Sequence, residues 1–186
     1  GMVCANKIPI GSLKLDLILN RYQKYYKKES FDIVFLAQYV ENDTPYFKVK
    51  THEKIIDNLC SFKKNHPNLS VYYSEKKKKY KSIKYNSMMD RIKLSGIVCS
   101  SNNIDNSYEA ILCSEVALFY RTTIGLEALA MDKMVLNLNY DNDMIPMFPK
   151  DGCSVISSSY NEFENRVLTL LKVSKGSTGY DNKKLT

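Results

Sequence analysis

The chain of 186 residues is long enough for one well-filled domain and short for two, and its 44% of apolar residues can build a core. The 27 Lys and Arg against 20 Asp and Glu give a net charge of +7. This excess is local, because residues 63–93 hold 10 basic and 2 acidic side chains, whereas 94–186 hold 8 and 11. The uneven charge argues against a uniformly basic coat for nucleic acid and indicates a local patch that faces anions.

Composition also argues against membrane-spanning, secreted and metal-binding classes. No apolar run reaches the roughly 18–20 residues of a membrane span, and no charged-then-apolar signal pattern opens the chain. The five cysteines show no C-x-x-C spacing, and only two histidines could join them in a metal site. We expect a cytoplasmic protein with reduced thiols and no metal site.

The first predicted element is a buried strand at 31–38, a compact apolar run rich in β-forming residues. Asp43, shortly before Pro45, then marks a helix start, and apolar residues at near-helical spacing predict a helix over 45–64. A second strand follows at 69–74. The lysine-rich stretch after it is assigned no helix or strand.

The second half of the chain alternates strands and helices. A strand at 96–101 precedes a helix over about 105–114. A strand at 116–120 leads into a helix at 122–131, and a fifth strand spans 133–139. These are the strand-then-helix units of a parallel sheet.

A short sixth strand at 153–158 precedes a final helix. Ser159, followed three residues later by Glu162, forms a capping box that predicts where this helix starts. Residues 175–186 are polar and contain Gly and Ser, so we expect a loose tail.

Strands that alternate with helices and are apolar on both faces predict an α/β fold, with a doubly wound, mainly parallel Rossmann-like sheet and helices on both faces. We place this domain at 31–174, with residues 1–30 as an N-terminal linker and lead-in segment. In such sheets ligands bind beyond the carboxyl ends of the strands, where loops lead into helix N-termini. Candidate binding residues are therefore expected in the turns that follow the strands.

The turn after the fourth strand holds the strongest candidates. Arg121, Thr122 and Thr123 form this turn and lead into a helix whose first N–H groups lack partners within the helix. These N–H groups, the helix dipole and the two threonine hydroxyls favour a phosphate. Glu127 lies on the same helix face as Thr123, where its carboxylate can accept from two vicinal hydroxyls of a ribose. Gly125 removes a side chain where a ligand or a neighbouring backbone comes close.

Each of these residues also has a purely structural explanation. A threonine at a helix start is often only an N-cap, and a glutamate in the first turn is ordinary complementation of the helix dipole. Arg121 is either a second phosphate clamp or a surface residue at a strand end. The residue spacing by itself leaves both explanations open.

Residues 121–139 resemble a signature found in the C-terminal half of GT-B nucleotide-sugar-dependent glycosyltransferases. They read RTTIGLEALAMDKMVLNLN, against S-S/T-T-x-G-x-E-A-L-x-x-G-K-P-V-I in those enzymes and in related glycerophosphotransferases and 2-epimerases. Residues 8–16 are also similar to the segment that opens this half. The resemblance implies that Thr122 and Thr123 hold the donor phosphate and that Glu127 holds the ribose.

The chain departs from this signature at three positions. Arg121 stands where a small hydroxyl residue is usual, Asp132 replaces a glycine, and Met134 replaces a proline. These changes are compatible with the loop but leave the identity of the donor open.

Loops after the other strands supply further candidates. Lys76 opens a run of four lysines after the second strand, and it either contacts donor phosphate or belongs to a solvated face. Tyr140 and Asp141 leave the fifth strand where GT-B relatives often contact the donor sugar. Asn102 and Asn103 either meet a base edge or form a turn.

His52 lies in a segment that resembles the K-x-H-P strand end whose histidine contacts donor phosphate in several of these transferases. A strand at 46–51 would leave too short a crossover from the strand at 31–38, because parallel neighbours need about a dozen residues or more. The helix over 45–64 avoids this conflict. We therefore expect His52 on a helix surface, with ligand contact as the alternative.

The resemblance implies the donor-binding half of a GT-B glycosyltransferase of bacterial surface polysaccharide synthesis. This domain would bind a nucleotide sugar without a metal or other cofactor, and the sugar would pass to a saccharide or lipid-linked acceptor. The N-terminal domain of such an enzyme is absent from this chain, and we assign no catalytic residue. A glycerophosphotransferase or UDP-sugar 2-epimerase-like domain, and a non-catalytic Rossmann-like binding module, are the alternatives. We expect no nucleic-acid partner, and we leave peripheral contact with a membrane open.

Overall fold

The structure is a computed structural model of the chain. It describes residues 20, 30–39, 42–44, 47–75, 82–99, 104, 106–141, 154–155 and 157–181, with the backbone alone at 154–155 and 177–181. The segment predicted to open the GT-B half, at 8–16, lies outside the described residues. Lys76, Asn102 and Asn103 also lie outside them.

Strands and helices alternate along the described chain. The strands are β1 (Phe31–Ala37), β2 (Val71–Glu75), β3 (Ser114–Phe119), β4 (Met134–Leu138) and β5 (Ser154–Val155). The helices are α2 (Val49–Asn65), α3 (Ile83–Leu94), α4 (Ser107–Leu112), α5 (Ile124–Ala130) and α6 (Tyr160–Asp181). The predicted strands at 31–38, 69–74, 116–120 and 133–139 are confirmed with ends shifted by one or two residues, and the final helix starts directly after Ser159 as predicted.

All five strands pair in parallel, in the order β2-β1-β3-β4-β5. Beyond β2, Val98 forms an isolated parallel bridge to Tyr72; its N–H donates to Val71 O at 2.9 Å, and its O accepts from Tyr73 N at 2.8 Å. If Val98 is counted as an edge strand, the spatial order is that of a dinucleotide-binding doubly wound sheet. The winding reverses between β1 and β3, so the switch point at which ligands bind lies there.

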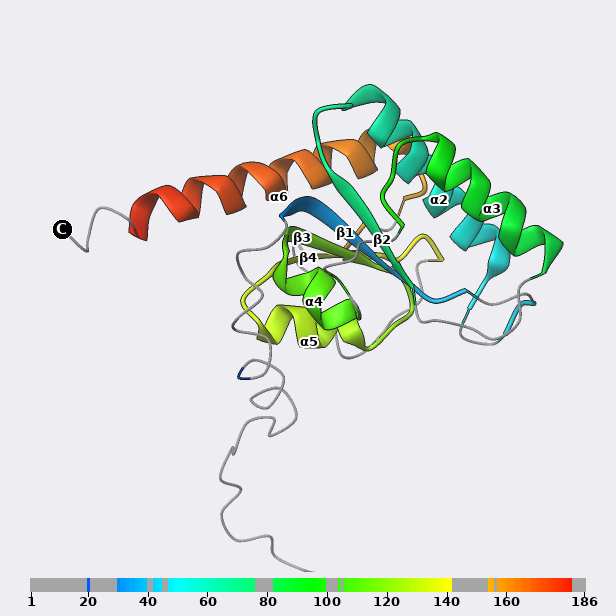
Figure 1. The fold of residues 1–186 in the computed structure, drawn as a ribbon, viewed down its shortest axis with the longest axis horizontal. Helices are drawn as coiled ribbons and strands as arrows, with labels where there is room; N and C mark the ends of the chain where they lie inside the picture. The colour runs from blue at the N-terminus through cyan, green and yellow to red at the C-terminus, as the bar shows by residue number, and fades with distance from the viewer. Residues whose placement is uncertain are drawn as a thin grey trace, which may run out of the picture.

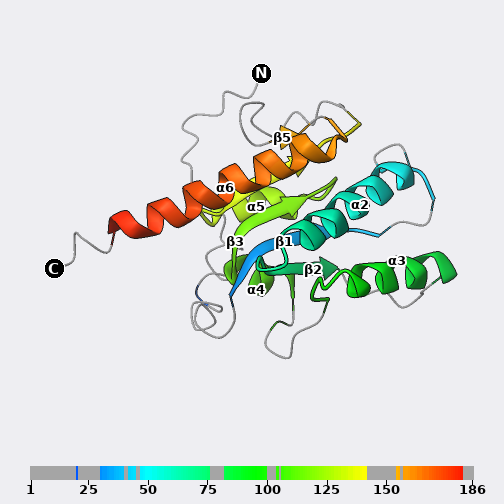
Figure 2. The same cartoon turned by 90° about the horizontal axis from the view of Figure 1, so that it is seen from above.

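Helices cover both faces of this sheet, as Figures 1 and 2 show: α2, α3 and α6 lie on one face, and α4 and α5 lie on the other. Successive strand residues point to opposite faces. Phe35 and Leu118 therefore enter the core under α2 and α6, whereas Leu36 and Phe119 enter the core under α4 and α5. The predicted doubly wound α/β fold is confirmed.

The helix predicted over 45–64 begins four residues later than expected. Thr44 and Phe47 first pair in an antiparallel bridge, with N···O distances of 2.9 and 3.3 Å. The Val49 N–H then donates to Asp43 Oδ1 at 2.8 Å. Asp43 thus stabilises the helix start as its position in the sequence suggested, but from six residues away.

The sequence prediction is incomplete around α3 in two respects. The strand expected at 96–101 is reduced, in the described residues, to a single bridge. No element was predicted where α3 forms, because among its residues only Met88 and Ile92 are buried and the apolar pattern is weak. Ser82 begins this helix by accepting the Tyr85 N–H at 3.2 Å.

The loose tail predicted at 175–186 is wrong for its first part, because α6 continues into it. Ser174 Oγ donates to Glu115, and Lys175 Nζ lies 2.7 Å from Asp32 Oδ1. These contacts join the helix to the amino ends of β3 and β1. Such long-range contacts hold a polar segment in a helix that its own composition does not favour.

Candidate functional site

The turn after β3 brings the predicted phosphate-binding residues to the switch point. Arg121 has a φ of 51°, a left-handed backbone that costs a residue with a side chain about 1 kcal/mol. Thr123 directly precedes α5, is exposed, and makes no side-chain hydrogen bond to cap the helix. The explanation of Thr123 as an ordinary N-cap therefore does not hold. Thr122, next to it, is partly exposed.

The helix that follows this turn is short. α5 has seven residues, and a macrodipole depends on aligned peptides along a helix. The helix dipole therefore contributes less to anion binding than the sequence suggested. Any phosphate bound at this turn depends mainly on the side chains of the turn.

Glu127 lies in the first turn of α5, as its spacing predicts, and it is held from a neighbouring helix. The hydroxyl of Tyr108, in α4, donates to Glu127 Oε2 at 2.6 Å. That distance is typical of a charge-assisted O–H···O⁻ bond. Sequence reasoning missed Tyr108, although its place just after a predicted strand at 96–101 put it among the segments that reach the carboxyl edge.

Gly125 makes the close approach that the sequence suggested, but to a different group. It is buried, and a Cβ atom at this position would lie 2.6 Å from the ring of Phe119. The neighbour is thus a side chain of β3 and not a backbone. Gly125 permits α5 to pack closely on the end of β3.

Asp141 joins three segments at the same edge of the sheet. The Tyr120 hydroxyl donates to Asp141 Oδ2 at 2.6 Å, and Thr51 Oγ1, in α2, donates to Asp141 Oδ1. Arg121 Nη2 lies 3.4 Å from Asp141 Oδ2. Only 13% of the Asp141 side chain and 11% of the Arg121 side chain are exposed. We term Thr51, Tyr120, Arg121 and Asp141 the Asp141 cluster.

The electrostatics of the Asp141 cluster favour a charged carboxylate. Burial by itself would raise the pKa of Asp141, but hydrogen bonds from Thr51, Tyr120 and Arg121 hold that pKa below its usual value. Burial and the hydrogen bond to Asp141 raise the pKa of Tyr120 to about 12. The Lys48 N–H also donates to the Tyr120 hydroxyl at 3.1 Å, which ties the start of α2 to the end of β3.

These contacts alter the expectation for the residues after β4. The Asp141 carboxylate accepts from groups inside the protein. The Tyr140 hydroxyl accepts from Asn58 Nδ2 at 2.9 Å, and burial raises the pKa of Tyr140 to about 12. Both side chains thus connect α2 to the end of β4, and their predicted contact with a donor sugar stays a prediction. The rest of that loop, at 142–153, lies outside the described residues.

His52 is not a surface residue, so that prediction is wrong. It is 2% exposed. Its ring packs against Phe35, Tyr39 and Phe47, with ring centroids 6.1, 6.5 and 5.4 Å away. The end of β1 and the bridge at Phe47 cover the first turn of α2, which the sequence did not indicate.

The predicted site residues fall into two groups on opposite sides of the turn after β3. The structure brings Arg121 and Asp141 together on the side of α2, and it places Glu127 beside Tyr108 on the side of α4. The two threonines of the turn lie between these groups along the chain.

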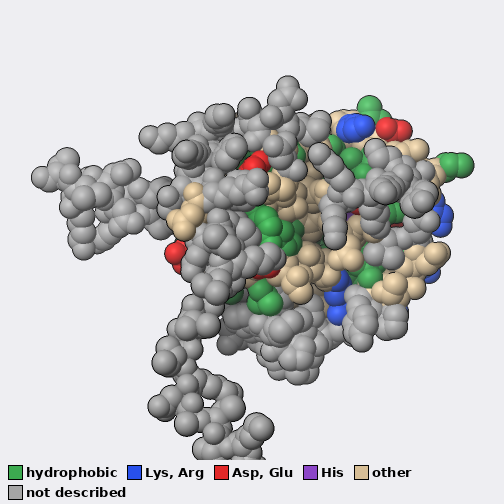
Figure 3. Space-filling view, turned by 60° about the horizontal axis from the view of Figure 1, so that its bottom comes forward, with side chains coloured by type: hydrophobic (Ala, Val, Ile, Leu, Met, Phe, Trp, Pro, Cys, Tyr) green, Lys and Arg blue, Asp and Glu red, His purple; other side chains and the backbone are tan. Residues whose placement is uncertain are grey.

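In Figure 3, which turns the α4 and α5 side forward, the described Lys and Arg side chains that can be seen lie toward the side on which α3 lies in Figure 1.

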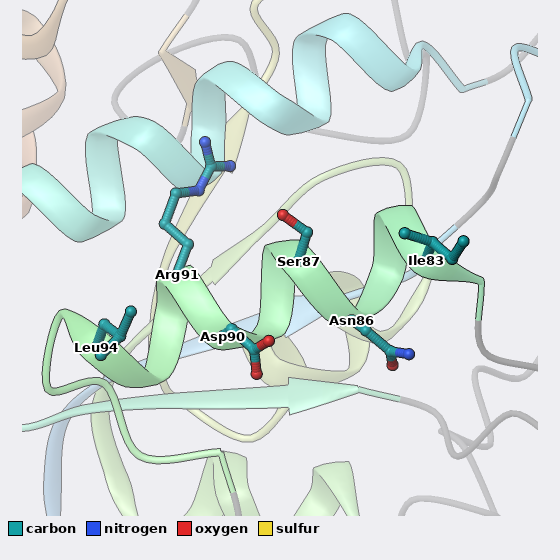
Figure 4. A pocket seen from close by; sticks show the side chains of 6 residues that line it. All are labelled: Ile83, Asn86, Ser87, Asp90, Arg91 and Leu94. Atoms are coloured by element: carbon teal, nitrogen blue, oxygen red, sulfur yellow. The ribbon is translucent and has the colours of Figure 1, made fainter.

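A groove follows the outer face of α3, as Figure 4 shows. It is lined by Ile83, Asn86, Ser87, Asp90, Arg91 and Leu94. Ile83 and Leu94, at its two ends, are 89% and 88% exposed. This groove contains none of the residues predicted to bind a donor.

Two properties of the described residues bear on metals and membranes. No three of their His, Cys, Asp and Glu side chains lie together as a metal ion requires. Within the same described ranges, every helix is too short or too polar to cross a membrane.

Comparison with known proteins relates the chain to others by structure and not by sequence. No family model and no curated protein matches it. The UDP-GlcNAc 2-epimerase of Methanocaldococcus jannaschii, solved with UDP-GlcNAc and UDP, matches with a TM-score of 0.53 at 13% identity, over 87% of this chain and 47% of that one. The C-terminal domain of LpcC, a glycosyl transferase group 1 family protein of Francisella tularensis, matches with a TM-score of 0.52 at 13% identity, over 84% and 83%.

These likenesses show the fold. The chain spans about half the length of the epimerase, and most of the length of an isolated C-terminal glycosyltransferase domain. The predicted architecture, a Rossmann-like fold that matches one half of the GT-B fold, is confirmed.

Proposed function

We propose that this chain is the donor-binding half of a glycosyltransferase that uses a nucleotide sugar in surface polysaccharide synthesis. The observation that carries the proposal is the placement of Thr122, Thr123 and Glu127 together, in one strand-to-helix turn and the helical turn after it, beside the switch point of the sheet. The fold likeness to a C-terminal glycosyltransferase domain and to an epimerase solved with UDP-GlcNAc supports a nucleotide sugar as the ligand class.

In this proposal each residue of the turn has a separate task. The hydroxyls of Thr122 and Thr123 donate to phosphate oxygens of the donor, and Arg121 adds positive charge beside them. Glu127 accepts hydrogen bonds from the ribose hydroxyls. Donors that are already in place around the departing nucleotide phosphate stabilise its negative charge as the sugar leaves, without a metal or cofactor.

The remaining parts of the proposal concern partners. The acceptor is a saccharide or a lipid-linked saccharide, and the acceptor-binding domain is a separate N-terminal domain. Lys76, in the segment of the sequence that follows β2, adds positive charge near the donor phosphates. We expect the protein in the cytoplasm, in peripheral contact with the membrane that holds a lipid-linked acceptor.

The second candidate function is a UDP-sugar 2-epimerase-like domain. The TM-score of 0.53 to an epimerase favours it, and the same phosphate and ribose contacts would serve both reactions. The two differ in the fate of the sugar, since an epimerase keeps it on the nucleotide. Recovery of an epimerised UDP-sugar, without release of UDP, would decide for the epimerase.

Calorimetric titration of the chain with UDP, CMP, CDP and GDP tests the donor site. We expect at least one nucleotide to bind, in EDTA as well as in Mg²⁺, and Glu127→Ala to weaken it about tenfold. Glu162, in the first turn of α6, provides a matched control, and Glu162→Ala should bind as the wild type does. The absence of any nucleotide binding would reject the donor-site proposal, and equal affinity of Glu127→Ala would reject the role of Glu127.

The phosphate contacts are tested by removing hydroxyls without changing shape. Thr122→Val and Thr123→Val should each weaken binding of the diphosphate about 3- to 10-fold and leave binding of the bare nucleoside unchanged. Thr169→Val, which removes an exposed hydroxyl bonded to Asn165 O at 2.7 Å in α6, is the control. Equal losses for nucleoside and diphosphate would show that the two threonines do not contact phosphate.

The lysine run distinguishes donor binding from binding to an anionic surface. Lys76→Glu should weaken binding of the diphosphate if Lys76 lies near the donor. A non-catalytic surface-binding module would instead lose salt-sensitive binding to vesicles of anionic lipid when the four lysines from Lys76 are reversed, with nucleotide affinity intact.

A further inference from the structure

Tyr108 and Glu127 meet at the edge of the sheet where ligands bind. Each lies in the first turn of its own helix, α4 and α5. α5 follows the carboxyl end of β3, and Ser107, the first residue of α4, lies beside the end of β2, where Ser74 Oγ donates to Ser107 Oγ at 3.1 Å. The 2.6 Å hydrogen bond between Tyr108 and Glu127 therefore lies beside the switch point.

The backbone that carries Tyr108 is fixed by several contacts. Asn106 Oδ1 accepts from Tyr108 N at 2.9 Å and from Glu109 N at 3.1 Å, and Asn106 Nδ2 donates to Glu109 Oε1 at 3.2 Å. Ala110 and Ile111, in the next turn, are fully buried against the sheet. The Tyr108 hydroxyl thus projects from a rigid and well-capped helix start.

A glutamate side chain held in this way can still bind a diol. An ionised carboxylate has two oxygens with about four acceptor sites, so a carboxylate that accepts the tyrosine hydroxyl keeps the capacity to accept from other donors. Two vicinal hydroxyls of a ribose need two of these sites. The hydrogen bond also restricts the Glu127 rotamer before a ligand arrives, so that less conformational entropy is lost on binding.

We propose that Tyr108 is a positioning residue that orients Glu127 toward the ribose diol and so makes the site selective for ribonucleotides over 2′-deoxyribonucleotides. This inference rests on the proposed donor site. It goes beyond that site because it assigns the discrimination between ribose and 2′-deoxyribose to a pair of residues from two helices. A purely structural bond between α4 and α5 would alter stability and would leave this choice unchanged.

The test compares one nucleotide with its 2′-deoxy counterpart. UDP and dUDP, or CDP and dCDP if cytidine binds better, are titrated into the wild type, Tyr108→Phe, Glu127→Gln and the double variant. The Tyr160 hydroxyl donates to Glu164 Oε1 at 2.6 Å at the start of α6, so Tyr160→Phe removes the same kind of bond outside the proposed site and is the control. Circular dichroism before each titration verifies that the variants fold.

We expect Tyr108→Phe to bind the ribonucleotide about 3- to 10-fold more weakly and the deoxyribonucleotide within about twofold of the wild type. In Glu127→Gln, adding Tyr108→Phe should cause little further loss, because Tyr108 acts on the ribose only through Glu127. Tyr160→Phe should leave both affinities unchanged.

Three results would overturn the inference. Unchanged discrimination in Tyr108→Phe, with discrimination lost in Glu127→Gln, would leave the donor site standing and reduce Tyr108 to a contact between helices. Equal weakening for ribo- and deoxyribonucleotide in Tyr108→Phe would have the same meaning. Failure of the wild type to bind any nucleoside diphosphate would reject the donor site, and the positioning role with it.

Discussion

Asp141 and Glu127 are two carboxylates at the same edge of the sheet, and each accepts a tyrosine hydroxyl at 2.6 Å. Asp141 also accepts hydrogen bonds from Thr51 and Arg121, so that it connects α2, the turn after β3 and the end of β4. Glu127 is contacted by Tyr108 from α4 and lies one helical turn from the exposed Thr123. We infer that Asp141 belongs to the frame of the edge and Glu127 to its binding surface. A tyrosine–carboxylate bond by itself does not distinguish these roles, whereas the low exposure of Asp141 and the exposed Thr123 one helical turn from Glu127 do.

Removal of each carboxylate gives the largest expected contrast. Asp141→Ala should lower the free energy of unfolding by about 3 kcal/mol, because it removes the acceptor of the buried Tyr120 hydroxyl and the counter-charge of Arg121. Glu127→Ala should lower it by less than about 1 kcal/mol. Urea denaturation measures both. Equal losses for the two variants would end the distinction between frame and binding surface.

Gly125→Ala tests how much the close contact between α5 and the end of β3 contributes to the free energy of unfolding. The added methyl group would lie 2.6 Å from the Phe119 ring, so α5 must shift, at an expected cost of about 2 kcal/mol. Gly176→Ala in α6 is the matched control, because no atom lies within 4 Å of its added Cβ. Urea denaturation should show a loss for Gly125→Ala and none for Gly176→Ala. A fully stable Gly125→Ala protein would show that α5 does not need its close contact with β3.

Acid should act on the frame through Asp141. Its pKa is lowered in the folded state, so the folded protein binds fewer protons than the unfolded chain as the pH falls below the unfolded pKa of about 4. The stabilisation is therefore present above that pH and is lost as the pH falls through the folded pKa. Asp141→Asn should reduce the decline in unfolding free energy between pH 5 and pH 3, measured by urea denaturation at each pH.

A second lowered pKa allows this effect to be assigned. Burial opposes the charged form of Asp32, but hydrogen bonds from Lys175 and Ser70 hold its pKa below the usual value. Asp32→Asn should remove a separate part of the same decline, and the double variant should remove both parts. An unchanged decline in Asp141→Asn would mean that the Asp141 cluster does not stabilise the charged carboxylate.

The smallest expected effect is that of Asp132→Gly, which measures the energetic cost of a left-handed backbone like that of Arg121. Asp132 has a similar backbone, with a φ of 57° against 51° at Arg121, and it stands where related signatures have glycine. Asp132→Gly should raise the free energy of unfolding by about 0.5 kcal/mol, because glycine adopts this conformation without steric cost. Asp132→Val should lower the free energy of unfolding. Differential scanning calorimetry detects both changes. A loss on Asp132→Gly would show that the Asp132 side chain compensates for its own strain.

The fold could be predicted well from the sequence because the strands can be recognised from local apolar runs. The run at 31–38 and the four buried apolar residues of α2 at helical spacing need no distant partner to be recognised. α3 was missed because only Met88 and Ile92 anchor it. The apolar pattern of a helix that contacts the rest of the protein so little resembles that of a solvated loop.

The candidate site was predicted less completely, for a physical reason. The turn from Arg121 to Glu127 is continuous in sequence, so its spacing could be interpreted directly. The partners that decide what each side chain does come from elsewhere: Tyr108 lies 19 residues from Glu127, and Thr51 lies 90 residues from Asp141. No local pattern contains such pairs, so the sequence did not indicate the contacts that Asp141 makes inside the protein.

The separation between Thr51 and Asp141 also bears on the order of folding. A contact that closes 90 residues of chain carries a large loop entropy, and it becomes favourable only after nearer elements have formed. β1, β3 and β4 must lie in register before Tyr120 and Asp141 can meet the start of α2. The carboxyl edge should therefore be completed late in folding, and a nascent chain that has made all of its helices would still lack the proposed donor site.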